Sequence, residues 1–330
     1  IDYCGWTYKY LSALQETPLN ETLRDFSKDV LINMTTGLAN LMAVPNGGLG
    51  SDYGGILARG VCPPDQKALW PSIFRDDHPK HFNGTGKYSN WRYRGYTSND
   101  EFGGYYLFMA VATKYLRHIP YINETVGKIA DQICFNMLQN NFLGIHGTGA
   151  LTGVDQKPRM FSGGFWAPLV LKMGAIYFPE KYEDAYHNRV ASEMNYLSNV
   201  EGGSQETIAN YYAYNFGSCV CLAFLILEDS DSEIWKVYFQ GYLDSMWHFT
   251  RYHRNAWFNA IFLTICHENG ITSEDVEEDL NIVALDVEDQ LRRFTDSHYP
   301  NYNYLINKTL SDDYETIQPV QNFVDKLGLS

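Results

Sequence analysis

The chain alternates two kinds of apolar segment of helical length, and this alternation limits the fold more than any other feature. One kind repeats apolar residues at i, i+3, i+4 and i+7, which places them on one side of a helix. The clearest example covers residues 126–138, where Lys128, Asp131 and Gln132 are expected to face water. The same spacing recurs in residues 23–38, 186–197, 234–249 and 280–294.

The other kind of segment is apolar almost all round, and it separates the first kind along the chain. It covers residues 102–116, 165–178, 211–227 and 256–266. A helix without a polar face must be covered on every side. One-sided outer helices that alternate with fully covered inner helices predict an all-α fold, an α/α toroid of helical hairpins. An irregular helical bundle with the same alternation is the alternative.

A single domain is expected over residues 1–330, because 45% of the residues are hydrophobic and no linker-like stretch divides the chain. Residues 1–20 form an N-terminal segment, and the polar residues 296–330 form a C-terminal tail. Residues 43–96 are a long connection rich in Gly, Pro and aromatic residues, the usual place for a loop over a binding site. Within it, residues 46–60 and 86–96 also suit short β-hairpins.

The charge of the chain limits its partners. A net charge of -14 and a pI near 5.0 argue against nucleic acid and sulfated glycans, which usually require a basic surface. A neutral or weakly charged ligand is favoured, although Lys80, His81, Arg92 and Arg94 could form a local basic patch. No apolar run approaches the roughly 20 residues that span a bilayer, so no membrane span is expected.

Several features predict a secreted glycoprotein. The chain begins at Ile1 without Met, as expected after removal of a signal peptide, and it holds an even number of cysteines, six. Glycosylation sequons occur at Asn20, Asn33, Asn83, Asn123 and Asn307. Cys4 and Cys62 are the disulfide candidates because their surroundings resemble loops. The other four, Cys134, Cys219, Cys221 and Cys266, fall in apolar helical runs where buried thiols are equally expected.

Residues 88–101 have the composition of a sugar-binding mouth, because they crowd aromatic residues, two arginines and two carboxylates before an apolar helix. Trp91, Arg92, Arg94 and Tyr96 are therefore predicted to bind substrate. Further binding residues are expected near the starts of the inner helices: Trp166, Tyr212, Asn215, His253, Asn255 and Trp257. The tryptophans among them would form a stacking platform, unless they simply pack in the core.

The segment from Trp91 to Tyr105 carries a Trp-x-x-x-Gly-x-Thr-Ser-x-Asp-Glu motif, and Asn255-Ala256-Trp257-Phe258 opens a later apolar helix. In these residues and in the order of its elements, the chain resembles the six-hairpin glycosidase superfamily of (α/α) toroids. More narrowly, it is similar to an uncharacterised microbial family with the first motif. The resemblance implies a toroid whose site lies at the mouths of the inner helices, with Asp100 and Glu101 facing the cavity.

A glycoside hydrolase is the favoured function. Such enzymes need two carboxyl groups on opposite sides of the scissile bond, so Asp100 or Glu101 requires a partner from another loop. Glu206 and Asp155 are the favoured candidates, and Glu201 is a less favoured one. His146, in the Gly-rich run 144–149, is a further catalytic candidate. The competing interpretation is that Ser98 and Glu101 form the capping box of a helix.

Two other functions stay open. A polysaccharide lyase acting on a uronate could use Tyr, Asn, Arg and His, which Tyr211, Tyr212, Asn215, Arg94 and His146 supply. A non-catalytic lectin-like, storage or structural glycoprotein, with self-association, fits the composition equally. No cofactor is predicted: the histidines lack metal-ligand spacing, and Asp and Asn oxygens leave calcium as the weaker alternative.

Overall fold

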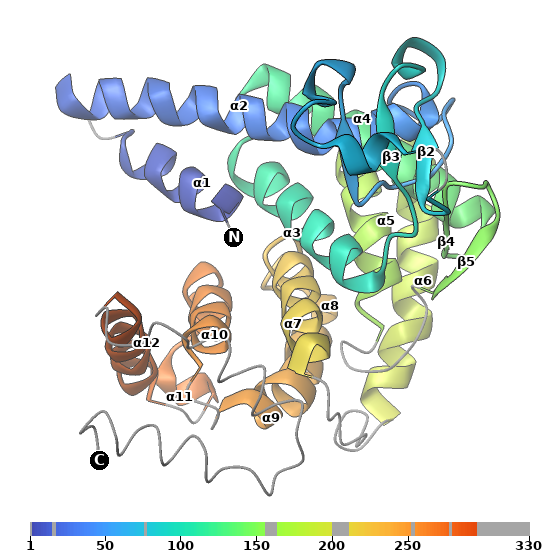
Figure 1. Cartoon of the computed structure of the whole chain (residues 1–330). Helices are drawn as coiled ribbons and strands as arrows, with labels where there is room; N and C mark the ends of the chain where they lie inside the picture. The colour runs from blue at the N-terminus through green and yellow to red at the C-terminus, as the bar shows by residue number, and fades with distance from the viewer. Residues whose placement is uncertain are drawn as a thin grey trace, which may run out of the picture.

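Consecutive helices pack in pairs, and the pairs follow one another along a curve that stays open on one side (Figure 1). This computed structural model describes residues 2–14, 18–75, 78–155, 164–199, 211–251, 255–276 and 279–295. The helices are α1 (Asp2–Ser12), α2 (Pro18–Asn46), α3 (Asn99–Tyr115), α4 (Pro120–Gln139), α5 (Trp166–Tyr177), α6 (Pro179–Asn199), α7 (Tyr211–Leu225), α8 (Glu233–Tyr242), α9 (His248–Thr250), α10 (Ala256–Glu268), α11 (Ser273–Val276) and α12 (Leu280–Thr295). The mostly helical fold that the sequence predicts is confirmed.

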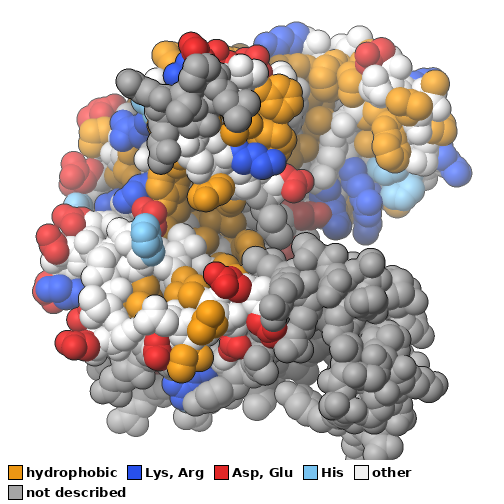
Figure 2. Space-filling view, turned by 90° about the vertical axis from the view of Figure 1, so that its left-hand side faces the viewer, with side chains coloured by type: hydrophobic (Ala, Val, Ile, Leu, Met, Phe, Trp, Pro, Cys, Tyr) orange, Lys and Arg blue, Asp and Glu red, His pale blue; other side chains and the backbone are white. Residues whose placement is uncertain are grey.

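The pairs are α1 with α2, α3 with α4, α5 with α6, α7 with α8, and α10 with α12. In Figure 1 they run from the upper left, through the right, to the lower left. Figure 2 looks into the open side, where a recess with hydrophobic side chains on its wall separates the upper and lower parts of the molecule. None of the described helices is long and apolar enough to cross a membrane.

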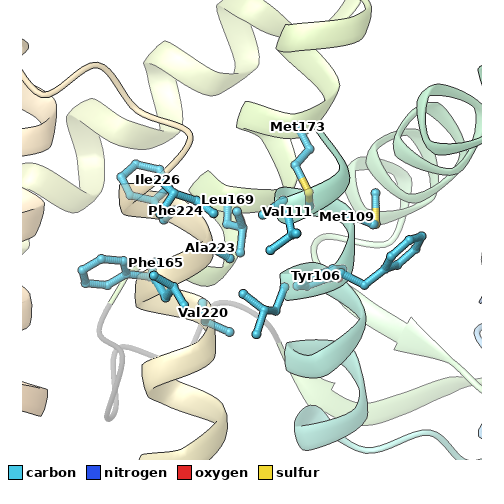
Figure 3. Close-up of a cluster of buried hydrophobic side chains, with 14 of the residues drawn as sticks. Tyr106, Met109, Val111, Phe165, Leu169, Met173, Val220, Ala223, Phe224 and Ile226 are labelled. Atoms are coloured by element: carbon cyan, nitrogen blue, oxygen red, sulfur yellow. The ribbon is translucent and has the colours of Figure 1, made fainter. Parts of the chain in front are cut away.

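The centre of the core is made by α3, α5 and α7, which the sequence predicts to be covered on all sides (Figure 3). Tyr106 of α3, Leu169 of α5 and Phe224 of α7 are each fully buried. Burying a large apolar side chain stabilises the fold by about 1.5–3 kcal/mol. The three helices therefore hold the frame on which the loops at their N-termini are built.

A glycine lets α3 and α7 approach each other closely. A Cβ at Gly103 would lie 3.3 Å from Cβ of Phe216 in α7 and 3.3 Å from Cη2 of Trp166 at the start of α5. The rings of Trp166 and Phe216 meet edge to face with centroids 5.8 Å apart. The N-terminal parts of α3, α5 and α7 therefore lie close together, at the second turns of α3 and α7 and the first turn of α5.

Residues 60–94 form a small cap over α2 instead of an irregular loop. Its sheet contains β1 (Gly60–Cys62), β3 (Arg92–Arg94) and β2 (His81–Asn83), in that order and antiparallel. Val61, Tyr93 and Phe82 are paired across the strands, and this row packs on Val44 and Ala58. Short 3-10 helices lie between the strands, at Pro64–Gln66, Pro71–Phe74 and Gly86–Tyr88. A strand within residues 86–96 is confirmed as β3, but its partners β1 and β2 both lie before residue 86, so the pairing extends beyond the expected segment.

The prediction that Asp131 and Gln132 face water is wrong, because both hold the loop that leads from α2 to the cap. The side chain of Gln132 accepts from the Gly50 N–H at 3.1 Å and donates to the Gly54 carbonyl at 2.6 Å. Asp131 accepts from the Tyr182 hydroxyl at 2.7 Å and from Lys181 at 3.2 Å. Burial raises the pKa of Asp131, but these bonds and one from the Ser51 N–H outweigh it and lower the pKa.

The predicted core face of α2 is also wrong. Leu23 and Phe26 are exposed, whereas Ser27 and Thr35 are fully buried. Thr35 shares a 3.0 Å hydrogen bond with the Tyr3 hydroxyl of α1, a helix that lies within the expected N-terminal segment. The buried face of α2 is therefore rotated by about one residue, because α1 offers a polar partner that the periodicity of α2 does not reveal.

Candidate functional site

The aromatic residues of the cap continue outward as a stack of four rings. Tyr93 lies in the core, and its ring centroid is 5.4 Å from that of Phe82. Phe82 is 6.3 Å from Tyr96, and Tyr96 is 4.6 Å from His146 with ring planes only 12° apart. These four residues, here termed the aromatic column, bring together the Tyr-rich run of β3 and the Gly-rich loop that carries His146.

Two glycines and one left-handed residue make the column possible. A Cβ at Gly95 would lie 2.9 Å from the Phe82 ring, and one at Gly147 would lie 2.4 Å from it. Tyr96 has φ of 64°, a conformation that residues with side chains rarely adopt and that often marks functional sites. The Tyr93 hydroxyl donates to the Gly147 carbonyl at 3.3 Å. Burial raises the pKa of Tyr93 to about 12, so this donor stays protonated.

The loop that carries His146 belongs to a second, two-stranded sheet, which the sequence did not reveal. It contains β4 (Leu143–Ile145) and β5 (Leu151–Asp155), and Ile145 also forms a parallel bridge to Ile56 below the cap. The Thr148 hydroxyl lies 2.7 Å from Nδ1 of His146 and fixes the ring. The imidazole is thereby held parallel to the Tyr96 ring.

The outer end of the column is open to water and carries a positive charge. Tyr96 is 36% exposed, and Nζ of the exposed Lys80 lies 5.8 Å from its ring centroid. A cation at this distance is attracted by the face of the ring. Aromatic faces bind the C–H faces of sugar rings, and ammonium and imidazole N–H groups donate to hydroxyls. The column therefore supplies both kinds of contact that a carbohydrate needs.

The N-terminus of α3 follows the column directly and holds the two predicted carboxylates. Ser98 and Glu101 form a capping box, in which Glu101 accepts from the Ser98 N–H at 2.7 Å. Glu101 also forms an ion pair with Arg59. Asp100 is exposed and accepts from the Ser98 hydroxyl. The capping interpretation is thus correct for Glu101, and Asp100 is the carboxylate that a ligand can reach.

No family model matches this chain. No curated protein and no solved structure matches it either. Its function is therefore inferred from the chemistry of the site.

Two of the predicted binding residues, Arg92 and Trp166, are buried and stabilise the fold. Arg92 is 6% exposed, and its guanidinium donates to the carbonyls of Ile73 and Arg75 and to Oδ1 of Asn83. It therefore fastens the 3-10 segment of the cap to the sheet. Trp166 is 4% exposed and packs between α3 and α7. Its ring is part of the core.

The remaining predicted residues lie apart from the column or outside the description. Trp91 is half-buried and packs on Tyr88, while Arg94 is exposed on the face of the cap sheet that is opposite Tyr93. Asn255 caps α10 by accepting from the Trp257 N–H at 2.8 Å. Asn215 is half-buried in α7. Glu201, Glu206, His253 and Asn307 lie outside the described residues, and only the backbone is described for Asn20, Asp155, Tyr211 and Tyr212.

The disulfide prediction is not met, because all six cysteines are free thiols. Cys4 lies in a helix and not in a loop, and Cys62 is buried at the end of β1, where its thiol points to the Pro63 carbonyl. Burial raises the pKa of both thiols. Cys134, Cys221 and Cys266 are buried, as the competing interpretation predicts.

Sequence reasoning missed two residues of the site, Phe82 and Arg59, and named Lys80 only as part of a local basic patch. Phe82 lies inside the long connection, where no periodicity indicates a strand. The only signal was indirect, since Gly95 and Gly147 are the two glycines that touch its ring. Within the described ranges, no group of three His, Cys, Asp or Glu side chains could hold a metal ion.

Proposed function

We propose that this protein binds carbohydrate at the outer end of the aromatic column and acts on it as a glycoside hydrolase with Asp100 as one catalytic carboxyl group. The observation that carries the proposal is the stack of Tyr96 on His146 beside Lys80, because Tyr96 lies in the segment that leads directly into the start of α3, where Asp100 is exposed. The fold that we propose with it is an α/α toroid of helical hairpins. The close approach of α3, α5 and α7 within their first two turns supports that arrangement.

The roles follow from the contacts of each side chain. Tyr96 and His146 would stack on or border a sugar ring, and Lys80 would donate to its hydroxyls. Asp100 would protonate or attack at the glycosidic bond, with a second carboxyl group from a loop that also reaches the mouth. Glu101 would position the start of α3, because it is already held by Ser98 and Arg59.

A non-catalytic, lectin-like role is the second candidate, and one observation favours it. Of the adjacent carboxylates Asp100 and Glu101, only Asp100 is exposed and outside an ion pair with a basic side chain. A hydrolase requires a partner carboxyl group about 5–10 Å from Asp100. A binding protein requires none. The lyase alternative would instead use Tyr96 or His146 as the base that removes the proton next to a uronate carboxylate.

The proposal is tested by binding and by product release on a panel of neutral and acidic polysaccharides. Tyr96→Ala and His146→Ala should each weaken binding about tenfold, as expected for the loss of one stacking contact. Tyr8→Ala, which removes a ring that is 73% exposed on α1 and outside the column, is the control and should bind normally. Wild-type binding by both column variants would refute the carbohydrate site.

Catalysis is tested separately with Asp100→Asn, with Asp52→Asn as the control at another exposed acid. Hydrolysis that Asp100→Asn abolishes and Asp52→Asn preserves supports the enzyme. Binding without any product supports the lectin-like role. A product with the ultraviolet absorbance of an unsaturated uronate would replace hydrolysis with elimination.

A further inference from the structure

The positive charge of the protein is concentrated in the cap. Residues 60–94 contain six Lys and Arg against three Asp, a formal charge of +3, while the whole chain carries -14. The rest of the chain therefore carries -17. Among the described residues, Lys67, Lys80 and Arg94 form no ion pair with a carboxylate. The average charge of the chain thus conceals a basic surface.

The same cap exposes two adjacent apolar side chains. Leu69 is 70% exposed and Trp70 is 63% exposed, and residues 67–72 are exposed throughout. These residues, here termed the cap tip, follow the 3-10 helix Pro64–Gln66 and include the start of the 3-10 helix Pro71–Phe74.

The backbone of the cap tip is held by its own hydrogen bonds. The N–H groups of Leu69 and Trp70 both donate to the Gln66 carbonyl at 3.0 Å, and the Ile73 N–H donates to the Trp70 carbonyl at 3.2 Å. A backbone that satisfies its polar groups locally can enter a medium of low polarity at less free-energy cost. The tip therefore presents its apolar side chains in a fixed conformation.

We propose that the cap docks this protein on the surface of an anionic lipid bilayer. Leu69 and Trp70 enter the interface between headgroups and acyl chains, and Lys67 lies at the level of the anionic headgroups. Trp favours this depth because its ring is apolar and its N–H is polar. Basic residues near an anionic surface add attraction that weakens with salt. The acidic remainder of the chain is repelled, which orients the molecule with the cap toward the lipid.

A lipid surface fits the cap tip better than a glycan or a protein does. A sugar could stack on Trp70, but the neighbouring Leu69 offers neither a flat face nor a polar group. A protein interface usually buries about 800 Å² on each partner, and the apolar part of the tip is two side chains. An interface that accepts a few apolar side chains inside a basic surface is characteristic of peripheral membrane binding.

The test is sedimentation of the full chain with vesicles of phosphatidylcholine alone and of phosphatidylcholine mixed with phosphatidylglycerol. We expect binding to the anionic vesicles that falls as salt is raised. Leu69→Ser and Trp70→Ser should each lower the partition coefficient about tenfold. Tyr8→Ser in α1 and Leu14→Ser in the turn after it remove exposed apolar side chains and should leave binding unchanged. Circular dichroism checks that all variants are folded.

Three results would overturn the proposal: no sedimentation with anionic vesicles, equal binding to neutral vesicles, or normal binding by both tip variants. Loss of polysaccharide binding in the tip variants, without any vesicle binding, would also overturn it and make Trp70 a sugar-stacking residue. The Tyr96 and His146 variants should bind vesicles normally, so this test and that of the carbohydrate site fail independently.

Discussion

Adjacent glycines in the first two turns of α3 provide a direct test of how closely α3 and α7 pack. At Gly103 a Cβ would lie 3.3 Å from Cβ of Phe216 and 3.4 Å from its carbonyl oxygen, which is tighter than ordinary contact. At Gly104 a Cβ would have no neighbour within 4 Å. Both residues have ordinary helical φ angles, so Gly103→Ala and Gly104→Ala differ only in what the new methyl group meets.

The two substitutions should change stability in different directions. Alanine favours a helix over glycine by about 1 kcal/mol, and this gain applies at both positions. Forcing a methyl group into a packed contact costs about 1–3 kcal/mol. Gly104→Ala should therefore stabilise the protein by about 1 kcal/mol. Gly103→Ala should range from no change to a loss of about 2 kcal/mol.

Urea unfolding followed by circular dichroism measures both changes, and thermal unfolding should show Gly104→Ala melting about 2 °C higher than wild type. Gly103→Val, with its larger β-branched side chain, should lose more than Gly103→Ala. Equal stabilisation by the two alanine variants would refute the close approach. In that case, the convergence of α3, α5 and α7 that supports the proposed toroid would be wrong.

Three further predictions concern buried polar contacts and glycosylation. Asp131→Asn should be less stable than wild type at neutral pH, and urea unfolding at several pH values measures the difference. Because the pKa of Asp131 is lowered in the folded protein, the stability that its carboxylate contributes is complete above the ordinary carboxyl pKa of about 4 and is lost as the pH falls through the folded pKa. Arg92→Lys should lower the free energy of unfolding by about 1–3 kcal/mol, because three acceptors lose their guanidinium donors. Arg94→Lys, at an exposed position, should change it by no more than about 0.5 kcal/mol, and thermal unfolding compares the two variants. In a glycosylating host, glycopeptide mass spectrometry should find Asn83 occupied and Asn123 unmodified, since Asn83 is exposed and the amide oxygen of Asn123 is buried; full occupancy of Asn123 would contradict this.

The sequence predicts the inner helices well because their burial leaves no polar face. α3, α5, α7 and α10 begin and end close to the predicted apolar runs. The capping box at Ser98 was also readable, since its residue types and spacing are local. Buried helices and helix caps can therefore be predicted from the sequence, because each depends on residues that are close together in the chain.

Features that depend on a distant partner were missed or misplaced. Thr35 and Gln132 are polar residues on buried faces, and each is satisfied by a segment far away in the sequence. The aromatic column joins β2, β3 and the loop after β4 through Phe82, which no local pattern distinguishes. The sequence named Tyr96 and His146 as candidates separately, but only the fold brings their rings together.

The order in which the helical pairs pack has a consequence for synthesis on the ribosome. The cap, the aromatic column and the capped start of α3 all lie within residues 59–147, so the proposed binding face can assemble before the second half of the chain emerges. α3, however, buries one side against α7, whose residues are translated much later. A nascent chain therefore exposes the apolar surface around Gly103 for as long as it takes to synthesise more than 100 further residues. During that interval, the uncovered face of α3 is open to aggregation or to binding by a chaperone.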